Sequence, residues 1–141
     1  MSQIQAEEDP GFKEVMPDAA GFQAVKKGQE VEYYRAVDKV NKMIGVVFKA
    51  SAKGYSSAID TLVGMLNDGT ITAIKVTSQN ETPGLGGRVS ESDFAGRFAK
   101  KKIDKLGEVQ AITGATVSSN AVIAAVKAKA EEIKALLQNG Q

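Results

Sequence analysis

The chain has 141 residues, and its 18 Lys and Arg against 17 Asp and Glu give a formal charge of +1, too balanced to bind nucleic acid through bulk charge. It contains neither Cys nor His, which excludes disulfides, thiolate catalysis, Cys- or His-based metal sites and hydrolytic triads. We therefore expect one domain over residues 1–141, whose chemistry comes from a bound cofactor.

The N-terminal region is polar. Its first ten residues, MSQIQAEEDP, lack the basic start and apolar stretch of a signal peptide, and we expect them to be flexible. No apolar run in the sequence approaches the ~20 residues that cross a bilayer, so no transmembrane segment is predicted. Residues 12–25 contain Pro17 and predict short helical turns that pack as a lid or edge.

A central region has the composition of β-strands, rich in Val, Ile, Tyr and Phe. The expected strands cover about 31–37, 43–50, 58–66 and 70–78. The polar residues 38–42 suit a hairpin connection, and Asn-Asp-Gly at 67–69 is a turn sequence in which Asp and Gly accept positive φ. The pattern predicts a mainly antiparallel sheet from about Val31 to Ser78.

Two helices are predicted after these strands. The segment Ser90–Lys100 opens with Ser and early acidic residues and carries Phe94 and Phe98 at an i, i+4 spacing. A longer helix is expected over about Ser119–Leu137, with Ser118 or Ser119 as its cap. Together the elements predict an α+β fold, in which flanking helices pack on a mainly antiparallel sheet.

The segment NETPGLGG at 80–87 contains three Gly and one Pro, so it continues neither a helix nor a strand. One interpretation is a type II turn, in which Pro83 sets φ and Gly84 accepts a positive φ. The other is a ligand site, because glycine-rich backbone lets a planar ligand approach while Glu81 and Thr82 bond its polar edge. The spacing of the residues does not choose between them.

A second segment, TGATVSSN at 113–120, combines a Gly with four hydroxyl side chains directly before the last helix. It is interpreted either as a capped helix entry, in which Gly114 supplies an unusual backbone angle, or as a site for an anionic group such as a phosphate at the positive helix end. Neither this segment nor GLGGRV has the pattern of a Walker A loop or a Rossmann dinucleotide site.

Four motifs in this order and spacing carry a resemblance to a known family: KGY at 53–55, DGTI at 68–71, ETPGLG at 81–86 and AITGATVSS at 111–119. Over about Phe12 to Val126, the sequence resembles the FMN-binding domain of the G subunit of the Rnf electron-transport complex. A related domain is the C subunit of the sodium-pumping NADH:quinone reductase. The resemblance implies an electron carrier in a membrane-bound, ion-translocating ferredoxin:NAD oxidoreductase, which itself binds neither NAD nor ferredoxin.

The resemblance also implies the cofactor and its site. In the family, the last Thr of the Ser/Thr-Gly-Ala-Thr motif carries covalent FMN through a phosphoester bond, formed by a separate flavin transferase that uses FAD and a divalent metal. Matched onto this sequence, that residue is Thr116. The expected cofactor-binding residues are Thr113, Gly114, Ala115, Thr116 and Ser118 from the second motif, and Glu81, Thr82, Leu85 and Gly86 from the first.

The implied partners are the other Rnf subunits and the flavin transferase. In the family, one transmembrane helix precedes the domain, which lies on the extracytoplasmic side of the cell membrane; Met1–Pro10 matches no such helix. A second departure is Gln110, where the attachment motif normally has Asp, since a neutral amide is a poorer ligand for a hard cation. The alternative is therefore a non-redox binding or assembly module that has this fold and lacks flavin.

Overall fold

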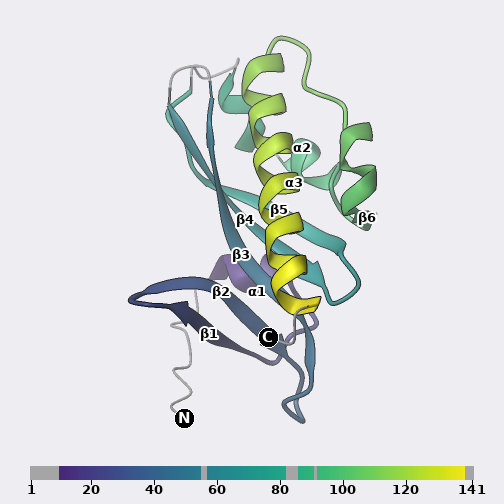
Figure 1. Ribbon diagram of the computed structural model, residues 1–141. Coiled ribbons are helices and arrows are strands. Elements are labelled where there is room, and N and C mark those ends of the chain that lie inside the picture. Colours follow the sequence, from purple (N-terminus) through teal and green to yellow (C-terminus); the bar gives the residue numbers. More distant parts are fainter. Residues whose placement is uncertain (1–9, 55–56, 82–85, 91, 139–141) are drawn as a thin grey trace.

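The computed structural model describes residues 10–54, 57–81, 86–90 and 92–138. In chain order the elements are α1 (Pro10–Val15), β1 (Gly21–Lys27), β2 (Glu30–Val37), β3 (Met43–Lys53), β4 (Ala58–Leu66), β5 (Thr70–Ser78), the 3-10 helix η1 (Gly86–Ser90), α2 (Ser92–Gly96), β6 (Lys101–Lys102), the 3-10 helix η2 (Ile103–Glu108) and α3 (Thr116–Gln138). The strands form a 6-stranded antiparallel sheet in the order β1-β2-β3-β4-β5-β6 (Figure 1). The predicted α+β class is confirmed.

The four predicted strands are present as β2 to β5, with the predicted antiparallel pairing. The Asn-Asp-Gly turn joins β4 to β5: Gly69 has a φ of +93° and its N–H donates to the Leu66 carbonyl at 2.9 Å. The backbone N–H of Thr70 donates to Asp68 Oδ1 at 2.9 Å, and this bond lowers the pKa of the Asp68 carboxyl below its ordinary value. Local turn chemistry thus fixes the register here.

The prediction of helical turns throughout residues 12–25 is wrong in its second half. The helix α1 ends before Pro17, as expected, but the chain then continues as the edge strand β1, which pairs with β2. Gly28, with a φ of +68°, lies in the turn between the two strands. Phe22 of β1 is buried against Phe12 of α1, with ring centroids 5.2 Å apart. Tertiary pairing and this aromatic contact override the local pattern.

The helix predicted over Ser90–Lys100 is shorter. Within that range the described helix is α2, a single turn, and the ring centroids of Phe94 in α2 and Phe98 after it are 5.2 Å apart. Lys100 adopts a φ of +63° and its N–H donates to the Ile71 carbonyl at 2.7 Å, which starts the short pairing of β6 with β5. Pairing with the sheet edge ends the helix.

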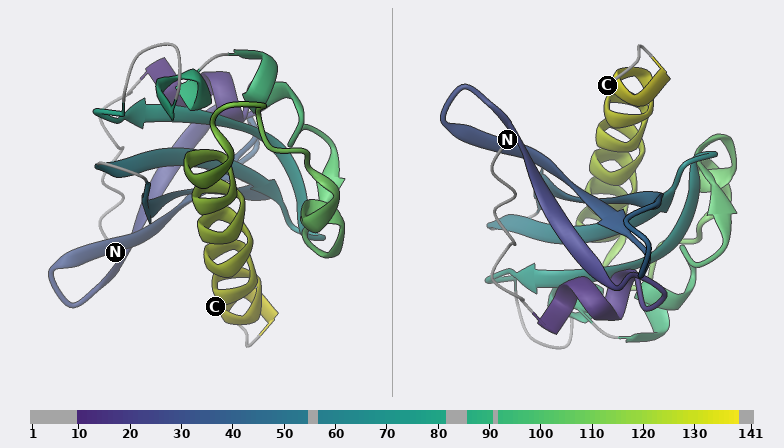
Figure 2. Two further views of the ribbon diagram at one scale, coloured as in Figure 1. Left: turned by 90° about the horizontal axis from the view of Figure 1, so that it is seen from above. Right: turned by 90° about the horizontal axis from the view of Figure 1, so that it is seen from below.

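Helices cover both faces of the sheet (Figure 2). On one face α3 packs on β3 and β4, and on the other α1 packs on β4 and β5. Side chains of β3 alternate between two apolar clusters: Phe48 packs in the cluster that holds Val126 of α3, whereas Val47 packs in the cluster that holds Val15 of α1. The sheet therefore supports α3, whose first turn carries the predicted attachment residue.

No helix in the described ranges is both long and apolar enough to span a lipid bilayer.

Gly64 of β4 lies where α1 crosses the sheet. A Cβ atom at this position would collide with the carbonyl oxygen of Val15 and lie 2.5 Å from Thr72 Oγ1. We expect Gly64→Ala to lower the free energy of unfolding by about 1–3 kcal/mol, measured by urea denaturation. Gly96→Ala is the matched control, because a Cβ there meets nothing within 4 Å and alanine favours the helix. Equal stability of the two variants would contradict this packing.

Candidate functional site

The start of α3 gathers the predicted attachment motif. The helix begins at Thr116, so the prediction that Ser118 or Ser119 caps it is wrong: both lie inside its first turn. Ser118 Oγ donates to Glu81 Oε1 at 2.6 Å, and Ser119 Oγ accepts from the N–H of Ile112 at 3.0 Å. Both serines are buried. Their hydroxyls tie the helix to the rest of the domain instead of capping its own amides.

Thr116 lies on the surface at the first position of the helix. The chain turns into α3 through Gly114, whose φ of +86° favours glycine, while the N–H of Ala115 donates to the Ile112 carbonyl at 2.9 Å. A Cβ atom at Gly114 would meet nothing within 4 Å, so the space beside it is open. Thr116, itself exposed, therefore follows an open stretch of the surface.

The backbone at this helix end provides donors. Among the residues that the structure describes, no acceptor bonds the N–H groups of Thr116, Val117 and Ser118. The side chain of Ala115, directly before the helix, has no oxygen to cap them. Unbonded amides and the helix dipole together favour a negatively charged group such as a phosphate ester at this position.

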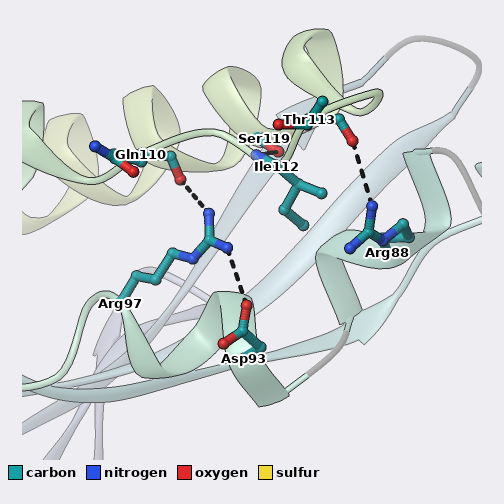
Figure 3. Close-up of polar contacts among 7 residues, drawn as sticks. All are labelled: Arg88, Asp93, Arg97, Gln110, Ile112, Thr113 and Ser119. Atoms are coloured by element: carbon teal, nitrogen blue, oxygen red, sulfur yellow. Dashed lines mark hydrogen bonds and ion pairs between the residues drawn. The ribbon is translucent and has the colours of Figure 1, made fainter.

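Two arginines hold the segment that leads into α3 (Figure 3). Arg88 of η1 donates to the Thr113 carbonyl at 3.3 Å, and Arg97, directly after α2, donates to the Gln110 carbonyl at 2.8 Å. Arg97 also pairs with Asp93 of α2 at 2.9 Å. The contacts use the backbone of the segment and leave the Gln110 side chain exposed. Nothing in the local sequence pattern predicted the two arginine contacts.

Glu81 brings the two predicted motifs together. Its side chain is buried, and its carboxylate accepts from Ser118 Oγ at 2.6 Å and from Ser57 Oγ at 2.6 Å. The Ser57 hydroxyl oxygen in turn accepts from the N–H of Asn80 at 3.0 Å. Ser57 was not among the predicted site residues, although it closely follows the KGY motif at 53–55.

The other predicted residues that the structure describes lie at the entry to α3 and at the start of η1. Thr113, Gly114, Ala115 and Thr116 form one contiguous entry to α3, with Thr113 and Gly114 exposed and Ala115 buried. Gly86 begins η1. Thr82 and Leu85 lie outside the described residues, so their predicted contact with the flavin ring, like that of Glu81, stays a prediction.

The family model for the FMN-binding domain matches residues 54–131, more than half of the chain, from Gly54 through Glu81 and Thr116. The chain belongs to the FMN-binding domain family. This FMN-binding domain is 36% identical over 140 residues to the G subunit of a proton-translocating ferredoxin:NAD(+) oxidoreductase complex from Clostridium ljungdahlii, covering 93% of this chain and 74% of the relative. It is 34% identical over 148 residues to the G subunit of an ion-translocating oxidoreductase complex from Methanosarcina acetivorans, covering 94% and 78%.

The fold of this FMN-binding domain is similar to that of NqrC. The crystal structure of Shewanella oneidensis NqrC superposes with a TM-score of 0.62 at 20% sequence identity, covering 92% of this chain and 78% of that chain. At this level of identity the comparison concerns the fold alone. The predicted resemblance to the FMN-binding domain of the Rnf G subunit and to its NADH:quinone reductase counterpart is confirmed.

Proposed function

We propose that this FMN-binding domain is the electron-carrying part of the G subunit in a membrane-bound, ion-translocating ferredoxin:NAD oxidoreductase of the Rnf type, with FMN attached covalently to Thr116. The other Rnf subunits are its working partners, and a flavin transferase matures it. The observation that carries the proposal is the exposed Thr116 hydroxyl at the first position of α3, beside helix-end amides without acceptors in the described chain. These residues fit a phosphate-bearing cofactor.

The structure distinguishes four hydroxyl side chains of the attachment motif. Ser118 and Ser119 are buried and hydrogen-bonded, which removes them from reach of a transferase. Thr113 is exposed but precedes Gly114 and lies outside the helix. Thr116 alone among the four combines exposure with the helix start, which supports it as the attachment residue.

The attachment reaction is a phosphoryl transfer. The Thr116 hydroxyl oxygen forms a bond to the phosphorus of the FMN half of FAD, the phosphoanhydride bond breaks, AMP leaves and the hydroxyl proton passes to a base of the transferase. A phosphodiester on Thr116 would keep about one negative charge, and the amide groups at the start of α3 would stabilise it. Bound FMN supplies one- and two-electron transfer, for which a chain without His or Cys has no group of its own.

The visible absorption spectrum tests this function against the flavin-free alternative. The chain is produced with a flavin transferase, unfolded in denaturant and passed through a desalting column. We expect flavin absorption to stay with the polypeptide. Flavin that separates from the unfolded chain would contradict covalent attachment, and protein without flavin before denaturation would favour a non-redox module.

Gln110 offers a test of maturation. Its side chain is exposed while its carbonyl accepts from Arg97 at 2.8 Å, so Gln110→Asp adds a carboxylate at the surface without disturbing that contact. We expect a faster initial rate of flavin transfer in Gln110→Asp, because a carboxylate is a better ligand for the divalent metal, with stability changed by less than about 0.5 kcal/mol. Gln110→Asn is the neutral control. Equal initial rates in all three proteins would show that the metal does not use this position.

A further inference from the structure

Three sequence motifs that lie far apart in the chain meet at the carboxylate of Glu81. Glu81 opens ETPGLG, Ser118 belongs to TGATVSS, and Gly54 is the centre of KGY. Ser118 lies 37 residues from Glu81 in sequence, and Ser57, beside the KGY motif, lies 24 residues away. Their convergence on one side chain gives a physical reason why the motifs occur together.

The hydrogen bonds to Glu81 from the two serines are short; the one from Ser118 is buried and the one from Ser57 is partly buried. Ser118 Oγ donates to Oε1 and Ser57 Oγ donates to Oε2, each at 2.6 Å, and the Glu81 side chain is only 5% exposed. Hydrogen bonds to a carboxylate are about twice as strong as those between neutral groups, and removing one partner in the interior leaves the other unsatisfied. The carboxylate therefore holds Ser57, directly before β4, and the first turn of α3 in a fixed relation.

Gly54 makes room for this carboxylate. A Cβ atom at position 54 would lie 2.5 Å from Glu81 Oε1 and 2.6 Å from Ile59 Cδ1. Ile59 is fully buried in β4, so it has no space into which to retreat. The glycine is required by close approach rather than by backbone conformation, and any larger residue displaces Glu81.

Ser118 follows Thr116 by two residues in the first turn of α3. A bond that fixes Ser118 thus also fixes the rotation of α3 about its axis and its position along that axis, and with them the place of Thr116. We infer that Glu81 is a positioning residue, which through Ser118 sets the place of Thr116 for flavin attachment; this inference rests on the proposed function. The Glu81 carboxylate accepts hydrogen bonds from serine hydroxyls, and its effect on Thr116 passes through the first turn of α3.

The test compares Glu81→Ala with Glu81→Gln in the full chain. Alanine removes the acceptor of the hydrogen bonds from Ser57 and Ser118. Glutamine keeps the shape and both contacts, since its carbonyl accepts from one serine while the hydroxyl of the other turns to accept from its amide. Glu132→Ala is the matched control, because its carboxylate is on the surface and pairs with Lys129 at 3.1 Å. Gly54→Ala is a second test variant, which displaces the Glu81 carboxylate without removing it.

Two readouts are used. The first is amide hydrogen exchange of the unmodified chain, which needs no flavin. We expect exchange of the hydrogen-bonded amides of Ile112, Ala115 and Ser119 to be about tenfold faster in Glu81→Ala and Gly54→Ala. Glu81→Gln and Glu132→Ala should stay close to the original chain. The second is the steady-state rate of flavin transfer by purified transferase with FAD. We expect turnover to fall about tenfold in Glu81→Ala at an unchanged KM for FAD, and to recover in Glu81→Gln.

Each result decides the inference. Unchanged exchange of the Ile112, Ala115 and Ser119 amides in Glu81→Ala overturns it, and so does exchange that rises uniformly over the chain, which indicates a general loss of stability. Unchanged turnover in Glu81→Ala overturns it as well. If the original chain accepts no flavin, the proposed function fails, and the local exchange result still decides whether Glu81 positions the helix start.

Discussion

Thr116→Val is expected to abolish covalent flavin attachment completely. Valine keeps the β-branched shape of threonine and removes only the hydroxyl, so the start of α3 is preserved. Because position 116 is exposed, stability should change by less than about 0.5 kcal/mol. The measurement is the intact mass of chain produced with a flavin transferase and denatured before analysis, in which the gain of one FMN less water should disappear.

Thr113→Val is the matched control for this loss. Thr113 carries the same side chain on the same exposed segment, and its contact with Arg88 uses the backbone carbonyl, which the substitution leaves in place. We expect the flavin mass to be detected in this variant, because the Thr116 hydroxyl is intact. Retention of the modification in Thr116→Val would contradict attachment at Thr116.

Phe48→Ala is expected to have the largest effect on folding. Phe48 is 1% exposed in β3, within the apolar cluster that supports α3. Truncation of a buried phenylalanine costs about 3–5 kcal/mol, a large fraction of the roughly 5–15 kcal/mol of a typical domain. Urea denaturation should show this loss as a lower midpoint, and flavin transfer should slow because α3 loses its support on the sheet.

Val40→Ala is the comparison, because Val40 is 79% exposed and its truncation removes no buried contact. We expect its free energy of unfolding to match that of the original chain within about 0.5 kcal/mol. A loss in Phe48→Ala of less than about 1 kcal/mol would mean that this face of the sheet is not the core of the domain.

The central strands could be predicted from sequence because their information is local. In β4 and β5, apolar composition flanks an Asn-Asp-Gly turn, and Gly69 takes the positive φ that this turn needs. The edge strand β1 could not, since its residues form a strand only when β2 supplies the hydrogen bonds and Phe12 covers Phe22. The same holds for β6, which ends the predicted helix near Lys100.

For the candidate site, the sequence predicted which motifs take part but not the contacts between them. The resemblance predicts Thr116 as the attachment residue from its motif, and this assignment stays a prediction. The role of Ser118 depends instead on Glu81, 37 residues away, and no local pattern distinguishes a serine that caps a helix from one that bonds a distant carboxylate. Only the fold brings Ser57 and Gly54 to the same carboxylate.

Fragmentation of one tryptic peptide tests the attachment residue most directly. Cleavage after Lys105 and Lys127 releases Leu106–Lys127, which contains Thr113, Thr116 and both serines of the motif. In chain produced with a flavin transferase, the fragment ions should place the flavin phosphodiester on Thr116. An unmodified peptide, or a flavin located on Thr113 or on either serine, would contradict the account.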